Sequence, residues 1–401
     1  MKKYILRKDY IDKIQPFIDK QLIKVIVGQR RVGKSYILYQ VMDFIKKLHP
    51  NANIIYIDKE LFKFDFIKNY EDLIKYVNKN TKRNKKTYLF LDEIQEINQF
   101  EKALRNWSNQ PDFDIYCTGS NAKMLSGELS TLIGGRYIEI KVYSLTYLEF
   151  LEFHNLENSK ESFFSYIKYG GLPFLKNLEL TENVVFDYLI NVYNTILYKD
   201  IISKYQIRNV TFLENLVRFL ADNVSSLLSA KKISDFLKSQ NISISPNIVL
   251  NYLSYLTSSY FIYKVQRSEV GGKKIFEIGE KYYFEDLGLR HTIVGFNIKD
   301  INKVLENLVY SHFATLGYTI TVGKLNTKEI DFVCSKENNT IYVQVAYLIT
   351  EESTVEREFS NLLAIQDNYP KMVISMDDIL NTDYKGIKHF NIIEFLTHFK
   401  Q

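Results

Sequence analysis

The sequence predicts an α/β protein whose first part is a parallel sheet, and three observations support this fold class. A short apolar run, Lys24–Val27, leads directly into a glycine-containing loop and then into a helical pattern. A second apolar run, Tyr88–Leu91, ends in two adjacent carboxylates. Between and beyond these runs, strand-like segments alternate with helical periodicity through residue 142, which indicates parallel strands joined by crossover helices in three layers.

The loop after the first run has the spacing G-x-x-x-x-G-K-S, and a helix pattern follows at once. Its residues are expected to bind the nucleotide, and they are Gly28, Gln29, Arg30, Arg31, Val32, Gly33, Lys34, Ser35 and Tyr36. Glycines allow backbone N–H groups to approach phosphates, and the helix N-terminus also attracts the anion. The pattern predicts that Lys34 reaches the β- and γ-phosphates of ATP and that the Ser35 hydroxyl holds Mg²⁺. The alternative, a strand-to-helix turn that binds nothing, is disfavoured by the flanking strand and helix.

The second apolar run ends in Asp92 and Glu93, fifty-eight residues after Lys34. The carboxyl ends of parallel strands meet at one edge of a sheet, where a carboxylate can bind Mg²⁺ through water. We therefore expect Asp92 to bind the metal and Glu93 to orient the attacking water or accept its proton. Acidic pairs after strands are also common on surfaces, but the position after a phosphate-binding loop predicts ATP hydrolysis.

Two later segments supply further candidates. A strand over 113–117 is followed by Thr118-Gly119-Ser120-Asn121, where Ser120 or Asn121 could position the water or simply cap a helix. Arg136 precedes a fifth strand over 137–142. It could stabilise transition-state charge on the ATP of a neighbouring subunit, or it could form a surface ion pair.

Composition narrows the class of protein. The 401 residues are 46% hydrophobic and 25% charged with a net charge of +5, as in soluble globular proteins, so any nucleic-acid surface must be local. The two cysteines, Cys117 and Cys334, and six scattered histidines predict neither disulfides nor a zinc site. The N-terminus does not resemble a signal peptide, and no apolar run is long enough to span a membrane. We expect a cytoplasmic protein with no membrane contact.

The motifs GQRRVGKS, LFLDEIQ, TGSN, GGRY and SLTYLEF together resemble AAA+ ATPases, and more narrowly a prokaryotic group of ATP-binding proteins with a C-terminal domain of unknown function. The resemblance implies a P-loop AAA+ nucleotide-binding core over 1–150 and a helical lid and linker over 151–222. Within the lid, the stretch 169–173 is similar to a Gly-x-Pro signature, which implies that Pro173 packs against the adenine. A lid arginine, which many AAA+ enzymes use, is not evident.

From residue 229 onward the pattern changes to a short helix over 230–239, a turn and a second helix that begins at Pro246. A hairpin is expected over 261–266 and 274–278, which completes a winged helix within a domain at 223–296. Residues 229–275 hold seven Lys or Arg against two Asp or Glu, which favours duplex DNA binding. Lys231, Lys232, Lys273 and Lys274 are the expected phosphate contacts, although winged helices in ATPases also serve for packing alone.

The final section, 297–401, shows helix, three strands, helix and strand, and resembles the restriction-endonuclease-like fold. The resemblance implies a metal-binding nuclease site, here degenerate, at Glu306, Glu329, Asp331 and Gln344. Ala346 stands where that site needs a lysine, and the section is acidic, which does not favour phosphate binding. The preceding stretch 281–290 resembles a linker signature of the prokaryotic ATP-binding group named above, and we expect its Asp286 and Arg290 to pair and lock the domains.

Three hypotheses about function follow. The first is an ATPase that couples its nucleotide state to a winged helix that binds DNA or a protein partner. The second is an ATP-gated nuclease that uses the C-terminal domain, which Ala346 argues against. The third is a nucleotide switch without hydrolysis that docks another protein, which Asp92 and Glu93 argue against. An oligomer is compatible with all three.

Overall fold

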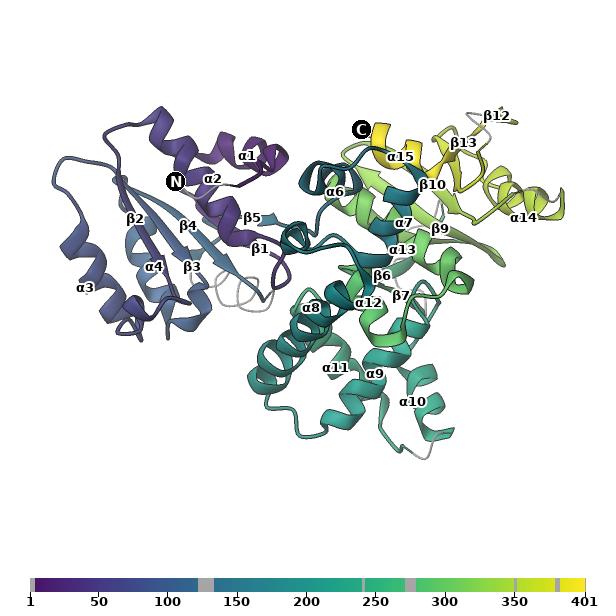
Figure 1. Ribbon diagram of the computed structural model, residues 1–401, viewed down its shortest axis with the longest axis horizontal. Helices are drawn as coiled ribbons and strands as arrows, with labels where there is room; N and C mark the ends of the chain where they lie inside the picture. Colours follow the sequence, from purple (N-terminus) through teal and green to yellow (C-terminus); the bar gives the residue numbers. More distant parts are fainter. Residues whose placement is uncertain are drawn as a thin grey trace. The chain divides into compact units, whose positions relative to one another are not determined.

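The computed structural model describes residues 4–121, 133–239, 242–270, 279–349, 352–378 and 383–400 (Figure 1). The chain divides into two compact units. The first unit contains Met1–Tyr143 and Ser258–Tyr260, and the second contains Ser144–Thr257 and Phe261–Gln401.

The first unit is built on a five-stranded sheet in which every described pairing is parallel, as predicted. Its strands are β1 (Ile23–Val27), β2 (Asn53–Asp58), β3 (Thr87–Asp92), β4 (Phe113–Gly119) and β5 (Tyr137–Lys141). They lie in the order β2-β3-β4-β1-β5. Every residue of β1, β3 and β4 is buried, as expected for central strands covered on both faces. The register places Asp58 beside Asp92, and Val27 beside both Gly119 and Lys141, so these strand ends share one edge.

Helices of the first unit flank this sheet (Figure 1). They are α1 (Lys8–Ile14), η1 (Gln15–Phe17), α2 (Lys34–Leu48), η2 (Phe62–Phe64), α3 (Tyr70–Asn80), η3 (Ile94–Glu96) and α4 (Phe100–Ser108). Phe100, Leu104 and Trp107 are buried, as the periodicity of α4 predicts. The apolar periodicity of residues 65–79 predicts a helix with Phe66 on its inner face, but the helix begins only at Tyr70. Asn69 caps α3 by accepting bonds from two backbone N–H groups, so Phe66 precedes the helix and is 56% exposed.

The second unit begins with helices α6 (Tyr147–His154), α7 (Lys160–Tyr169), η5 (Pro173–Asn177), α8 (Glu182–Thr195), the π-helix η6 (Ile196–Ser203), α9 (Val210–Asp222) and α12 (Leu287–Val294). The predicted pairing of Asp286 with Arg290 is wrong. Asp286 caps α12 and accepts from the backbone N–H groups of Gly171 (2.8 Å) and Leu289 (3.1 Å). Arg290 instead forms an ion pair with Asp300 at 2.8 Å, because its side chain leaves α12 one turn further on.

Two further helices, α10 (Ala230–Ser239) and α11 (Pro246–Ser258), precede an antiparallel hairpin of β6 (Ile262–Glu269) and β7 (Glu280–Phe284). The second hairpin strand therefore lies after the predicted 274–278, and residues 271–278 are outside the described part of the chain. The hairpin is not isolated, since β6 also pairs in parallel with β8 through residues 267–269. It is thereby part of the C-terminal sheet.

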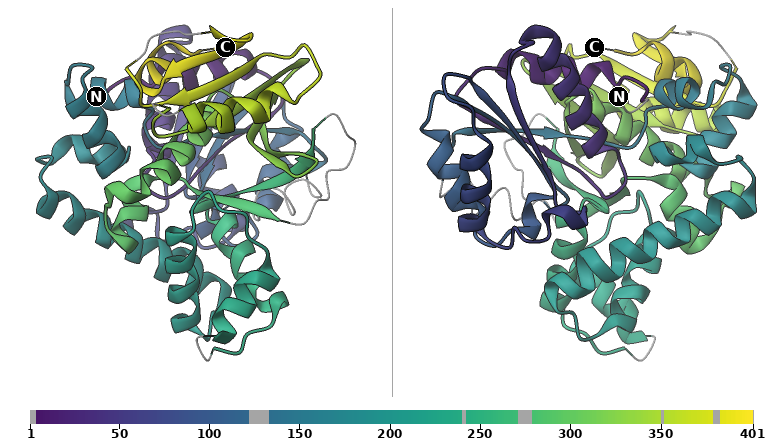
Figure 2. Two further views of the ribbon diagram at one scale, coloured as in Figure 1. Left: turned by 90° about the vertical axis from the view of Figure 1, so that its right-hand side faces the viewer. Right: turned by 60° about the vertical axis from the view of Figure 1, so that its left-hand side comes forward.

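That mixed sheet has eight strands in the order β12-β13-β11-β10-β9-β8-β6-β7, drawn in green to yellow in Figure 2. The helices and strands that follow the hairpin are η7 (Ile298–Asp300), α13 (Ile301–Thr315), β8 (Thr319–Leu325), β9 (Lys328–Lys336), β10 (Asn339–Val345), α14 (Glu352–Leu363), β11 (Lys371–Ser375), β12 (Asp383–Tyr384), β13 (Ile387–Asn391) and α15 (Ile392–His398). The order helix, three strands, helix and strand agrees with the prediction.

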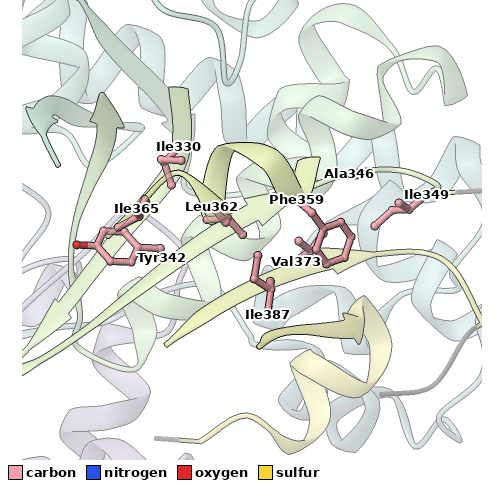
Figure 3. Packing of buried hydrophobic residues seen from close by; sticks show 9 residues of the cluster. All are labelled: Ile330, Tyr342, Ala346, Ile349, Phe359, Leu362, Ile365, Val373 and Ile387. Carbon is pink, nitrogen blue, oxygen red and sulfur yellow. The ribbon is translucent and has the colours of Figure 1, made fainter. Parts of the chain in front are cut away.

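An apolar cluster joins α14 to β9, β10, β11 and β13 (Figure 3). It consists of Ile330, Tyr342, Ala346, Ile349, Phe359, Leu362, Ile365, Val373 and Ile387. Ala346 therefore belongs to the packing beneath α14. A lysine at this position would place an ammonium group among these apolar side chains, which is unfavourable without a charged partner.

Candidate functional site

The phosphate loop lies between β1 and α2 at the carboxyl edge of the first sheet. A Cβ on Gly28 would lie 2.2 Å from the carbonyl oxygen of Val142, and its φ of +149° also favours glycine. Lys34 is buried, and its Nζ donates to the carbonyl oxygens of Gly28 and Gln29, both at 3.0 Å. The ammonium group thus lies over the loop, and its contact with the phosphates of ATP stays a prediction.

Ser35 and Asp92 meet at the same edge. Asp92 is buried, and its carboxylate accepts hydrogen bonds from Thr118 Oγ1 (2.5 Å), Tyr56 Oη (3.0 Å) and the Ser35 hydroxyl. Burial raises the pKa of Asp92, against the bonds from Thr118 and Ser35, which lower it. A hydroxyl and a carboxylate side by side are oxygen ligands of the kind that Mg²⁺ prefers, so the residues present fit this ion.

Glu93 is held beside Asp92 in a left-handed backbone conformation with φ of +53°. Its backbone N–H donates to Thr118 Oγ1 at 2.9 Å, so one hydroxyl contacts both acidic residues. The Glu93 carboxylate accepts from Gln95 Nε2, which also lies 3.4 Å from Ser120 Oγ. The predicted candidates Glu93 and Ser120 are therefore joined through Gln95, and Asn121 is buried next to Ser120.

The other phosphate-loop residues differ in exposure. Arg30 is buried and forms an ion pair with Glu60 at 3.2 Å, whereas Arg31 is exposed with φ of +72°. Tyr36 is 49% exposed and packs edge-to-face against Tyr39. Gln29 is fully buried, and within the described part of the chain its side-chain amide has no hydrogen-bond partner.

Arg7 supports the loop from the N-terminal segment, a role that the sequence did not indicate. Its Nη1 donates to the carbonyl oxygens of Val32 (3.1 Å) and Tyr143 (3.0 Å), and its backbone N–H donates to Gln40 Oε1 on α2. Thr118 and Gln95 were also missed as site residues. Both lie inside quoted motifs, TGSN and LFLDEIQ, but a single sequence gives no sign of which motif residues contact the carboxylates.

Arg136 lies at the amino end of β5, whereas the phosphate loop of its own chain follows the carboxyl end of β1. The backbone N–H of Ile23 donates to the Arg136 carbonyl at the start of β5, while the loop follows Val27 at the other end of β1. Five residues of strand span roughly 16 Å. The exposed Arg136 side chain donates to Asn109 Oδ1, and no ion pair of Arg136 is found among the described residues. It therefore cannot serve its own phosphate loop from this position.

Pro173 begins η5 in the second unit, directly after Gly170-Gly171-Leu172. A Cβ on Gly171 would lie 2.5 Å from the Leu145 carbonyl oxygen, so this segment packs tightly against the chain before α6. Contact of Pro173 with an adenine remains a prediction.

The C-terminal candidates do come together. Glu306 on α13 and Glu329 and Asp331 on β9 surround the Nζ atom of Lys281, which comes from β7. The fourth candidate, Gln344, accepts from the backbone N–H of Asp331 at 3.3 Å. Lys281 was not among the predicted residues, because it precedes the section in which the resemblance places the site.

The helix pair α10 and α11 presents two kinds of surface. Lys231 and Lys232 are exposed at the start of α10, whereas Lys273 and Lys274 lie outside the described residues. Helix α11 contains no lysine or arginine in its sequence, and its exposed side chains include Asn247, Ile248, Leu250 and Asn251.

In the part of the chain that the structure describes, no group of three or more histidine, cysteine or acidic side chains is arranged to hold a metal ion. The helices of these residues also include none that combines the length and apolar character needed to cross a bilayer.

Two protein families match separate parts of this chain. Residues 20–151 match the family described as AAA domain (AAA_14), which coincides with the parallel sheet and its phosphate loop. Residues 160–300 match a domain of unknown function (DUF8612). The first unit is thus an AAA+ P-loop core, and a second mixed sheet follows in the C-terminal region.

Two relatives extend over most of the chain, and both are named only as uncharacterized proteins. One, from Haemophilus influenzae, is 34% identical over 403 residues and spans 98% of this chain and 99% of the relative. The other, MJ1544 from Methanocaldococcus jannaschii, is 30% identical over 378 residues and spans 89% of this chain and 80% of the relative. This chain belongs to the family that these two proteins represent.

Among solved structures, the replication initiator DnaA bound to AMPPCP and single-stranded DNA is similar to 62% of this chain and 86% of its own chain. The sequence identity is 16% and the TM-score is 0.33, so this likeness supports no functional argument.

Proposed function

We propose that this protein hydrolyses ATP with Mg²⁺ and couples its nucleotide state to a winged helix that binds DNA or a protein partner. The observation that carries the proposal is the convergence of Lys34, Ser35, Asp92 and Glu93 at one edge of the first sheet. When bound, Mg²⁺ neutralises charge that develops on the phosphates.

Each residue has a distinct task in this proposal. Lys34 and the loop N–H groups bind the phosphates, and Ser35 and Asp92 hold the metal. Glu93 accepts the proton of the attacking water, and Asn121, together with Ser120 and Gln95, keeps the Glu93 carboxylate and the water in place. The Glu93 carboxylate already has a fixed hydrogen-bond donor in Gln95, which supports an oriented rather than a freely rotating base.

Arg136 acts in trans in this proposal, on the ATP of a neighbouring copy of the chain. Its exposed position at the far edge of its own sheet supports this assignment, because a guanidinium there can only reach phosphates that another subunit holds. Activity then requires an oligomer. Pro173 is assigned to the adenine on the resemblance of its sequence motif alone.

The winged helix is proposed for α10, α11 and the β6–β7 hairpin. Lys231 and Lys232 are exposed and can neutralise phosphates of duplex DNA. Because α11 has no basic side chain, base contacts would come from Asn247 and Asn251, since asparagine can pair with adenine in the major groove. The exposed apolar side chains of Ile248 and Leu250 are better suited to contact a protein than DNA. The assay below distinguishes between DNA and a protein as the partner.

The test is ATP turnover of the purified full chain, with and without duplex DNA. Lys34→Ala is expected to lose nucleotide binding, and Glu93→Gln is expected to bind ATP but lose turnover. Stimulation by DNA supports the DNA-coupled form, whereas turnover that DNA leaves unchanged favours a protein partner. A Glu93→Gln protein with the wild-type rate refutes the assignment of the base.

A further inference from the structure

The Nζ atom of Lys281 lies at the centre of three carboxylates in the second unit. It is 2.8 Å from Glu306 Oε1, 2.9 Å from Glu329 Oε1 and 3.2 Å from Asp331 Oδ1. An ammonium group has three N–H donors, and here each has a carboxylate oxygen within reach. The carboxylates come from α13 and β9 and the lysine from β7, so this single cation links three elements.

Lys281 remains charged in this setting. Its side chain is 3% exposed, and burial lowers its pKa, but the attraction of Glu306, Asp331 and Glu329 outweighs burial and the net pKa is raised. Burial also raises the pKa of Glu306 to about 8, although Lys281 opposes this shift. The ammonium group therefore offsets negative charge that would otherwise attract a divalent ion.

Several polar atoms of the centre have further protein partners. Asp331 Oδ2 accepts from the backbone N–H of Val345 at 3.0 Å, and Glu306 Oε1 also accepts from Tyr283 Oη at 2.6 Å. The side-chain oxygen of Gln344 accepts from the backbone N–H of Asp331. Each of the four side chains that the resemblance assigns to a metal therefore already uses at least one oxygen in a bond within the protein.

The resemblance of residues 297–401 to restriction endonucleases implies a divalent metal held by these same side chains. The structure does not fit that metal, because an ammonium group stands between the carboxylates at 2.8–3.2 Å and would repel it. Position 346, where the resemblance expects a lysine, lies instead in the apolar cluster under α14 (Figure 3).

We propose that Lys281 is the resident cation of this centre and replaces a divalent metal ion. The centre then holds β7, α13 and β9 together and does not support metal-dependent phosphodiester cleavage. Its lysine lies in the hairpin that follows α11, so this hairpin is tied to α13 and β9 without any added ion.

The test uses MnCl₂ without nucleotide, and measures both bound Mn²⁺ by electron paramagnetic resonance and the Tm of the full chain. Lys281→Met removes the charge while keeping an unbranched side chain. Lys264→Met is the matched control, since Lys264 lies on the same hairpin but is exposed and forms an ion pair with Glu280 at the surface. Glu329→Gln and Asp331→Asn report whether any bound Mn²⁺ belongs to the centre.

We expect neither wild type nor Lys264→Met to bind Mn²⁺ at this centre. Any Mn²⁺ binding or Mn²⁺-dependent rise in Tm that they show should persist in Glu329→Gln and Asp331→Asn. Lys281→Met should have a Tm about 5–15 °C lower, because it leaves buried carboxylates without a cation. Mn²⁺ should restore part of that loss with about one ion per chain, by mass action on the folded state, and Asp331→Asn should abolish the restoration.

Wild-type binding of Mn²⁺ that both acidic-site variants abolish overturns the proposal. A folded Lys281→Met protein with neither a lower Tm nor gained Mn²⁺ binding overturns it as well. If Lys281→Met does not fold with or without Mn²⁺, the wild-type titration against Glu329→Gln decides alone. None of these measurements depends on ATP turnover, so the outcome is separate from that of the proposed function.

Discussion

Thr118 donates a hydrogen bond from its Oγ1 to Asp92 Oδ1 at 2.5 Å, and the same oxygen accepts the backbone N–H of Glu93 at 2.9 Å. One hydroxyl on β4 thus orients the proposed metal ligand and the proposed base, which end the neighbouring strand β3. Thr118 and Asp92 are buried and Glu93 is half-buried, so movement of the hydroxyl would leave polar atoms with little access to water without their partner.

The first prediction concerns this hydroxyl. Thr118→Val keeps the shape of the side chain but removes the bond, and a lost hydrogen bond to a charged group costs about 1.5–3 kcal/mol. We expect ATP turnover to fall roughly 10- to 100-fold, with a higher Mg²⁺ requirement. Thr87→Val is the control, because Thr87 is a buried threonine at the other end of β3. Equal turnover of a folded Thr118→Val protein and wild type would contradict the role.

The second prediction concerns Arg136. If it acts in trans, turnover per chain rises with protein concentration, and Arg136→Ala lowers turnover on the order of 10³-fold. Lys34→Ala retains Arg136, while Arg136→Ala retains its phosphate loop, so mixing the two inactive proteins should restore some activity. Asn109→Ala removes the observed partner of Arg136 and serves as the control for a structural role. Turnover independent of concentration, with no rescue on mixing, assigns Arg136 to structure.

The third prediction concerns Lys231 and Lys232. If these exposed lysines neutralise phosphates, replacing both with glutamine should reduce the log–log salt dependence of duplex DNA binding by about 1.8, at 0.9 per phosphate. Lys385→Gln with Lys388→Gln removes the same charge from exposed positions near β13 and should leave the slope unchanged. If the salt dependence falls equally in both double variants, the effect is one of general charge. If the wild-type protein does not bind duplex DNA even at low salt, α10 and α11 are assigned to docking a protein.

The fourth prediction concerns the acid stability of the second unit. His312 is buried with its Nε2 3.0 Å from the Phe399 carbonyl oxygen, and burial lowers its pKa from 6.5 to about 4. Between pH 6.5 and pH 4 the His312 side chain therefore binds a proton in the unfolded chain but not in the folded chain. The stability that is present above pH 6.5 is lost as the pH falls toward 4.

Between pH 7.5 and pH 5, the free energy of unfolding of wild type should fall about 2 kcal/mol further than that of His312→Gln. Urea unfolding at a series of pH values measures this difference. His398→Gln, which changes an exposed histidine of α15, should follow wild type. Parallel pH profiles for wild type and His312→Gln would show that His312 is protonated as readily in the folded chain.

Much of the first unit could be predicted from the sequence, because its signals are local. The phosphate loop is eight consecutive residues between a strand and a helix, and Asp92 and Glu93 end an apolar run at the expected strand. The alternation of strands and helices also predicted the parallel sheet, whose register then brings Ser35 to Asp92. The start of α3 was missed, because the cap at Asn69 outweighed the apolar periodicity around Phe66.

The sequence by itself determined the phosphate-loop motif, the acidic pair after β3 and the positions of the strands of the first sheet, since all of these depend on neighbours within a few positions. Only the tertiary structure decided the partners that lie far apart in the chain: Arg7 on Val32, Thr118 on Asp92, and Lys281 among Glu306, Glu329 and Asp331. A single sequence contains no local sign of these pairs, because strand order and helix packing bring them together and burial then makes each charge require its partner.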